Sequence, residues 1–386
     1  MFYLLILIYS TFISLGLPDS LVGTTWPVMQ ADFGANLSSA GLIAMITTAG
    51  TVVSSLSSDT LIRCFGTGRV TAVSVGLTAI ALFGFHASLS LMGLCLWAIP
   101  LGLGGGAVDA GLNNFVAFHY KAIHMNWLHC FWGVGASAGP VIVSLFIAEP
   151  GGWRTGYLVI ALIQAALSLL LFCTLFMWKK VEFKKSEKKE MARRSLPELL
   201  KTRGVPCVLF SFFCYSTVEV IVGLWGSSYL VQHHHVTAEQ AAIWGAVFYM
   251  GITAGRFISG IFALRLSNTL LIRLGEVICL LGGVVLLLPF SRFTVVGFLL
   301  IGMGLAPIYP AMLFETPLRF GRELSQGLMG VQMACAYIGG TFMPPLFGVV
   351  AEKTSIEIFP WVILFVVAIM LLNNEKVTIL LKKTRS

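Results

Sequence analysis

The stretch WKKVEFKKSEKKEMARRSLPELLKTRG, residues 178–204, is the only long polar segment in a chain of 386 residues, and it holds ten of the 25 lysines and arginines. The rest of the chain is apolar, since 57% of all residues are hydrophobic and only 11% are charged. Runs of about 20 apolar residues recur on both sides of the segment, and each is long enough to cross a bilayer as a helix. The short alternating segments of a membrane β-barrel are absent. The sequence therefore indicates an integral membrane protein built of helices.

The polar segment also divides the chain near its middle. We expect six spans on each side of it, at residues 2–29, 38–62, 69–87, 90–117, 125–148, 153–178, 204–232, 237–264, 270–289, 293–314, 324–350 and 355–380. The predicted fold is an all-α membrane protein of twelve transmembrane helices in two pseudo-symmetric six-helix halves, residues 1–178 and 204–386. Residues 179–203 form the linker between them, and the second half ends in a short basic tail.

Basic residues are confined to alternate loops, which predicts the topology. One set of loops contains Arg63, Arg69, Lys121, the linker, Arg265, Arg273, Arg319, Arg322 and the tail, whereas the other set contains only Arg154, Arg292 and Lys353. By the positive-inside rule, both termini and the linker lie in the cytoplasm, and we expect the cell's inner (plasma) membrane. The net charge of +8 then reflects topology and not nucleic-acid binding.

Small residues and proline recur at corresponding places in the two halves. GVGASAGP (residues 133–140) lies in the fifth span and YIGGTFMPP (residues 337–345) in the eleventh. Small residues let membrane helices approach closely. The eighth span opens with Thr237-Ala238-Glu239-Gln240, a capping-box pattern. Two repeated halves are typical of transporters that rock around a substrate site near the middle of the bilayer.

Charged side chains deep in a membrane are costly, so they usually face a cavity or a partner. The deep candidates are Asp19, Asp109 and Glu219, with His129 as a titratable neighbour, and we expect every other acid to lie near the end of a span. Asp109 and Asn113 are four residues apart and share one helix face. A carboxyl group without hydration can hold a proton, whereas one with hydrogen-bond donors can accept from sugar hydroxyls. The alternative is a buried polar pair that only joins helices.

Other side chains are weaker candidates for substrate contact. Trp26, Trp225 and Tyr309 could stack on a sugar ring, although aromatic residues are common in membrane helices. Gln332 offers both a donor and an acceptor. No cysteine or histidine spacing suits a metal, the eight cysteines read as small hydrophobes, and no catalytic constellation is present. We therefore expect neither an enzyme nor a metal site nor a cofactor.

The loop SSDTLIRCFGTGRV (residues 57–70), the basic linker and the six-plus-six spans resemble the major facilitator superfamily. That resemblance implies gating or structural roles for Asp59 and Arg69, and a latch role for Arg256 in GITAGRFISGIFALR (residues 251–265). Within the superfamily the chain is similar to the fucose:proton symporter branch and its hexose transporters. The similarity lies in GLPDSLVGTTWP (residues 16–27), GLGGGAVDAGLNNFVA (residues 102–117), NWLHCFWGVGASAGP (residues 126–140), YSTVEVIVGLW (residues 215–225) and GLAPIYPAMLFETPLRFG (residues 304–321).

The resemblance implies that one acid of the first span and one of the fourth, here Asp19 and Asp109, serve proton coupling and sugar binding. Glu219 resembles the seventh-span glutamate of the hexose branch. We expect a monomeric, proton-coupled importer of a monosaccharide in the lipid bilayer that works by alternating access, with Na⁺ as an open alternative to the proton. The rivals are a proton antiporter that exports drugs or metabolites, favoured by GASAGP (residues 135–140), and a transporter-like sensor or lipid scramblase.

Overall fold

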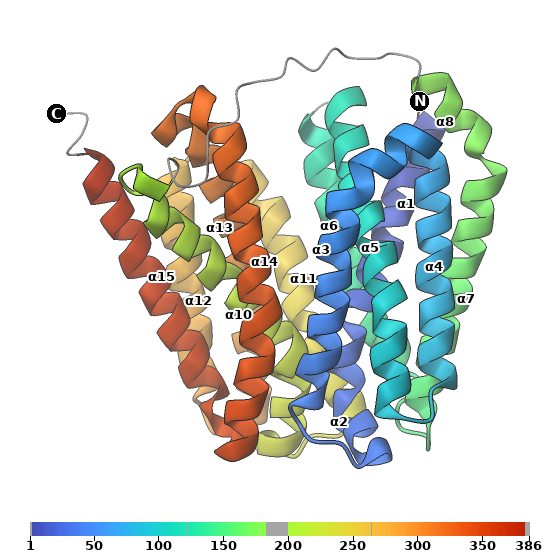
Figure 1. Cartoon of the computed structure of the whole chain (residues 1–386). Helices are drawn as coiled ribbons and strands as arrows, with labels where there is room; N and C mark the ends of the chain where they lie inside the picture. The colour runs from blue at the N-terminus through green and yellow to red at the C-terminus, as the bar shows by residue number, and fades with distance from the viewer. Residues whose placement is uncertain (1, 121, 183–199, 264, 383–386) are drawn as a thin grey trace. The chain divides into compact units, whose positions relative to one another are not determined.

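A computed structural model describes residues 2–120, 122–182, 200–263 and 265–382, and all regular structure in these ranges is helical (Figure 1). The helices are α1 (Phe2–Asp19), α2 (Leu21–Phe33), α3 (Ser39–Phe65), α4 (Thr67–Ala87), α5 (Leu91–His119), α6 (Ala122–Ser144), α7 (Gly152–Cys173), α8 (Leu175–Glu182), α10 (Val205–His234), α11 (Ala238–Phe262), α12 (Asn268–Leu286), α13 (Ser291–Phe320), α14 (Arg322–Lys353) and α15 (Phe359–Lys382). A short 3₁₀ turn, Ile356–Ile358, precedes α15.

Eleven segments of the described chain are long and apolar enough to cross a membrane, and each corresponds to one predicted span. The remaining predicted span, which is the fifth along the chain, overlaps with α6, a helix of 23 residues. The all-helical membrane fold is therefore confirmed. Most of the predicted linker lies outside the described residues, because only 179–182 and 200–203 are described.

The described helices group into two compact units. Unit 1 comprises residues 1–186, 223–250 and 345–356, and unit 2 comprises residues 187–222, 251–344 and 357–386. The division runs through α10, α11 and α14 and not only through the linker. The organisation into two six-helix halves stays a prediction.

Close helix packing in unit 1 depends on glycine. A Cβ atom added at Gly102 or Gly106 of α5 would overlap backbone carbonyl oxygens of α3, and one added at Gly135 or Gly139 of α6 would overlap carbonyl oxygens of α1. A cluster of apolar residues fills the space between α1, α4, α5, α6 and α7. The predicted role of small residues in close approach is confirmed for these pairs.

Unit 2 repeats this device. Gly251 and Gly255 of α11 lie against the backbone of α13, and Gly339 of α14 lies against a carbonyl oxygen of α10. One bond of the predicted capping box forms at the start of α11, in the part of that helix that belongs to unit 1, where the Gln240 backbone N–H donates to the Thr237 hydroxyl at 3.2 Å. Both units thus use close glycine contacts between helices, and the Thr237 bond confirms the predicted N-cap of α11.

Candidate functional site

The first span is broken beside its carboxylate. Helix α1 ends at Asp19 and α2 begins at Leu21, as the proline at position 18 predicts. The Ser20 hydroxyl donates to the carbonyl oxygen of Ala136 in α6 at 2.9 Å, and the Thr24 hydroxyl donates to the Ser20 carbonyl at 2.8 Å. The break is therefore held by hydrogen bonds to a neighbouring helix and to the next turn.

Asp19 lies at this break and is exposed, although Pro18 and Ser20 on either side are buried. The indole N–H of Trp132, in α6, donates to its Oδ2 at 2.7 Å. A carboxylate beside an aromatic ring can accept sugar hydroxyls while the ring packs against the sugar's apolar face.

Asp109 and Asn113 form the second polar pair of unit 1, in α5. The Asn113 amide donates to Asp109 Oδ1 at 2.9 Å, so the predicted shared face is confirmed. Both side chains are half-buried, and Asn113 Oδ1 is buried without a hydrogen-bond partner among the described residues. The pair keeps an unused acceptor next to a carboxyl group.

Glu219 is the centre of a polar group in unit 2. The Tyr215 hydroxyl, one turn earlier in α10, donates to Glu219 Oε1 at 3.2 Å. The Arg256 guanidinium of α11 interacts with both side chains, and the ring of Tyr309 in α13 lies 5.4 Å from that of Tyr215. Three helices therefore bring an acid, a base and two phenols together.

The described residues include three other predicted site residues, His129, Arg69 and the backbone of Asp59. His129 is half-buried in α6, and its ring meets that of Phe12 edge to face, with the centroids 6.0 Å apart. Arg69 is exposed in the first turn of α4. Asp59 belongs to α3, but its side chain lies outside the described residues.

Three predicted substrate ligands are core residues in this structure. Trp26 and Trp225 are fully buried, and Trp225 packs on Phe347 with ring centroids 5.9 Å apart. Gln332 of α14 is also fully buried, and its amide donates to the Thr316 hydroxyl at 2.9 Å. The contacts of Trp225 and Gln332 join neighbouring helices, and a role of all three side chains in substrate binding stays a prediction.

Sequence reasoning missed one deep acid. Glu276 is the ninth residue of the 19-residue helix α12 and is only 1% exposed, so the expectation that every other acid lies near the end of a span is wrong. The signal was its place inside an apolar run, about 12 Å along the helix from its start. Tyr215 was also missed, although a spacing of four residues from Glu219 puts both on one helix face.

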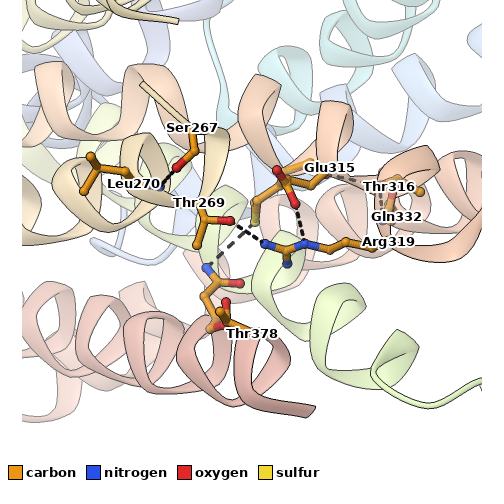
Figure 2. A network of polar contacts seen from close by, with 10 residues as sticks. Ser267, Thr269, Leu270, Glu315, Thr316, Arg319, Gln332 and Thr378 are labelled. Atoms are coloured by element: carbon orange, nitrogen blue, oxygen red, sulfur yellow. Dashed lines mark hydrogen bonds and ion pairs between the residues drawn. The ribbon is translucent and has the colours of Figure 1, made fainter. Parts of the chain in front are cut away.

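A nearly buried ion pair lies at the C-terminal end of α13. Arg319 donates through Nε to Glu315 Oε2 at 2.7 Å and through Nη2 to the Thr269 hydroxyl of α12 at 3.3 Å. Figure 2 shows the guanidinium between these two oxygen atoms. The helix continues to Phe320, beyond the predicted end of the span at residue 314, and the hydrogen bond from Arg319 to Thr269 ties this extension to α12.

Comparisons with known proteins agree with this architecture. The model of the Major Facilitator Superfamily matches residues 8–325 and, in a second match, residues 208–383. Bypass of stop codon protein 6 of Saccharomyces cerevisiae is 25% identical over 397 residues, covering 94% of this chain and 80% of that protein. The glucose/mannose transporter GlcP of Bacillus subtilis is 21% identical over 354 residues, covering 88% and 86%. A crystal structure of a mutant of the nucleoside transporter NupG is similar in fold, with a TM-score of 0.76, 14% identity and coverage of 97% and 98%.

Proposed function

We propose that this chain, which belongs to the Major Facilitator Superfamily, is a proton-coupled symporter of a monosaccharide, and specifically of a hexose. Membership makes it a multi-pass membrane protein and a secondary transporter of a small molecule, and not an enzyme. The proposal adds the substrate, the coupling ion and the direction of transport. It also adopts the plasma membrane and cytoplasmic termini, which the distribution of basic residues supports.

One observation carries the proposal: two carboxyl groups in apolar spans each have a polar side chain bonded to them. Asp19 accepts from Trp132, and Asp109 accepts from Asn113. Acids in membrane spans usually mark substrate pathways or proton relays. The similarity to a relative named as a glucose/mannose transporter supports a hexose as the substrate.

The two acids differ in exposure, and this difference suggests a division of labour. Asp19 is exposed and has an aromatic ring beside it, which suits a sugar ligand. Asp109 is less exposed and has an amide as its bonded partner, so its charge is the less well solvated of the two. We therefore assign sugar binding to Asp19 and proton carriage to Asp109.

Glu219, Tyr215 and Arg256 are the candidates for substrate contact from unit 2. A base that already interacts with an acid and a phenol can exchange one of these contacts for a sugar hydroxyl. This gives Arg256 a binding role beside the latch role implied by the resemblance. Tyr309 adds an aromatic wall through its contact with Tyr215.

The test is sugar-induced proton movement in proteoliposomes. Purified protein is reconstituted, a panel of hexoses is added outside, and the external pH is followed together with the uptake of radiolabelled sugar. Symport predicts alkalinisation of the medium when the right hexose is added. Asp109→Asn should abolish alkalinisation but keep sugar exchange across the membrane, whereas Asp19→Asn should lose both.

Glu149→Gln is the matched control, because Glu149 is an exposed acid in a loop of the same unit. It should behave as the unaltered protein. Sugar uptake that requires added Na⁺ and leaves the external pH unchanged would replace the proton with Na⁺ as the coupling ion. Proton-driven dye extrusion with no response to any hexose would contradict symport and favour export. The GASAGP motif gives export little support, since Gly135 and Gly139 serve helix packing.

A further inference from the structure

Glu276 of α12 is a buried carboxyl group that the proposed transport cycle does not use. Its Oε1 accepts from the Asn374 amide of α15 at 2.6 Å, and its Oε2 is buried without a hydrogen-bond partner in the described part of the chain. Asn374 in turn accepts from the Ser211 hydroxyl of α10 at 2.7 Å. A carboxyl group thus ends a hydrogen-bonded chain that crosses three helices of unit 2.

The direction of these bonds leaves Glu276 with one donor. The amide oxygen of Asn374 is occupied by Ser211, and Asn373 donates to the same hydroxyl at 2.8 Å, so the amide presents its N–H to the acid. An ionised Glu276 would hold a buried charge on a single neutral hydrogen bond. A neutral carboxyl group leaves only one hydroxyl unsatisfied, which is the smaller cost.

The titratable and charged groups around Glu276 include one cation, Arg273, which also pairs with a second acid. On its own helix lie Arg273 and Cys279, on α15 lies Glu375, and on α10 lies Cys214. Arg273 is held by Glu375 through two hydrogen bonds of 2.6 and 2.7 Å. From α13, Met312 contributes a thioether 3.9 Å from the Asn374 amide. The nearby cation is therefore already neutralised by another acid.

Unit 1 contains a corresponding chain of hydrogen bonds without an ionisable group. Ser14 of α1 donates to Gln164 Oε1 of α7 at 2.5 Å, and Thr78 of α4 donates to the same oxygen at 3.3 Å. In unit 1 a serine, a threonine and a glutamine follow one another along the chain. In unit 2 the corresponding order is serine, glutamate and asparagine, so Thr78 takes the place of Glu276. A hydroxyl group suffices to join the helices in unit 1, so joining helices does not require the carboxyl group of Glu276.

We propose that Glu276 is a second proton-binding site, which holds a proton in this conformation and releases it during transport. The proposal rests on the proposed proton-coupled function and adds to it a proton carrier in unit 2. The site does not suit a hard cation, because Asn374 presents an N–H and Cys214, Cys279 and Met312 present sulfur. Hard cations such as Na⁺ take oxygen ligands. The described residues contain no cluster of metal-ligating side chains.

Two measurements on the full-length protein test the proposal. Infrared absorption of the purified protein at neutral pH reports the carbonyl stretch of protonated carboxylic acids. Part of this band should be lost in Glu276→Gln and kept in Glu239→Gln, a control at an exposed acid of α11. In proteoliposomes, Glu276→Gln should keep the exchange of radiolabelled glucose but lose its proton-driven accumulation, which one charge can raise about 50-fold at 100 mV.

Further variants separate a proton site from damage to the fold. Glu276→Asp keeps an ionisable group and should restore part of the accumulation, whereas Glu276→Thr, which imitates Thr78, should fold and exchange glucose but accumulate none. An infrared band that is unchanged in Glu276→Gln would overturn the proposal. A band that is lost with accumulation intact would also overturn it, since the proton would then be structural. If the unaltered protein moves no sugar, the proposed function fails, and the infrared band still decides whether Glu276 holds a proton.

Discussion

Gly106 and Gly105 are neighbours in α5, yet alanine at the two positions should have opposite effects. A Cβ atom at Gly106 would lie closer than 3.0 Å to three backbone atoms of Thr51 in α3, which real Cβ atoms essentially never show. A Cβ atom at Gly105 would find its nearest neighbour at 3.7 Å, the Leu15 side chain, which is an ordinary contact. The pair therefore separates the steric effect from the change in helix propensity.

The expected magnitudes follow from these contacts. Alanine in place of glycine favours a helix by about 1 kcal/mol in both variants. Gly106→Ala must also push α3 from α5, which costs about 1–3 kcal/mol. The shift lengthens two hydrogen bonds to α5 carbonyl groups, from Ser55 at 3.1 Å and Thr51 at 3.3 Å, each worth about 1 kcal/mol. We expect a net loss of about 2–4 kcal/mol for Gly106→Ala and a gain of up to about 1 kcal/mol for Gly105→Ala.

The assay is the unfolding of both variants in the same detergent, followed by circular dichroism and by the fraction that remains monodisperse on size-exclusion chromatography. Transport should fall with stability in Gly106→Ala, because the displaced α5 carries Asp109. Gly105→Ala should keep transport. If Gly106→Ala were at least as stable as Gly105→Ala, then the close approach of α3 and α5 would not be as described.

Three other changes have defined outcomes. Trp132→Phe keeps the ring but removes the N–H that Asp19 accepts, so the KM for sugar should rise about 10-fold, corresponding to about 1.4 kcal/mol; an unchanged KM would contradict a role of this bond in binding. Glu315→Gln leaves Arg319 without its anion at a site where both side chains are 13–15% exposed, and should lower the free energy of unfolding by about 2 kcal/mol; a loss below the error of thermal unfolding would show that solvent screens the pair. Thr237→Ala removes the cap of α11 and should cost about 1 kcal/mol, whereas Thr237→Ser should cost little; equal losses in both would contradict capping.

The helices could be predicted because a bilayer leaves the backbone few choices. In hydrocarbon each peptide group must bond within its own helix, so a long apolar run has one solution. Length and hydropathy therefore locate the ends of the spans to within six residues. The cap of α11 followed from Thr237, because a cap acts through a bond within a few residues.

The candidate site was less predictable because its contacts are distant in the sequence. The bond between Trp132 and Asp19 joins residues 113 positions apart, whereas Asp109 and Asn113 pair within one turn and were foreseen. Aromatic residues were the least predictable. A span that is apolar on every side gives little indication of which face meets a ligand, so the buried positions of Trp26 and Trp225 had no signal in the pattern.

Glu276 shows a different limit. A span boundary drawn two residues too late placed this acid near a helix end, while the helix begins at Asn268 and encloses it. The hydrogen-bonded residues that lower the cost of burying this acid, Asn374 and Ser211, are polar residues of other spans. A search for amides and hydroxyl groups that repeat between corresponding spans would have pointed to the network.

The interruption at Ser20 divides the first span into two helical segments, α1 and α2. Segment α1 packs against α6, where Gly16 lies against a backbone carbonyl group. Segment α2 packs within unit 1 against α10, where Gly23 lies against the carbonyl of Gly223. A continuous helix would move as one body, whereas two helical segments can change their orientation separately. We therefore expect different rates of amide hydrogen exchange in α1 and α2, each close to the rate of the helix against which the segment packs.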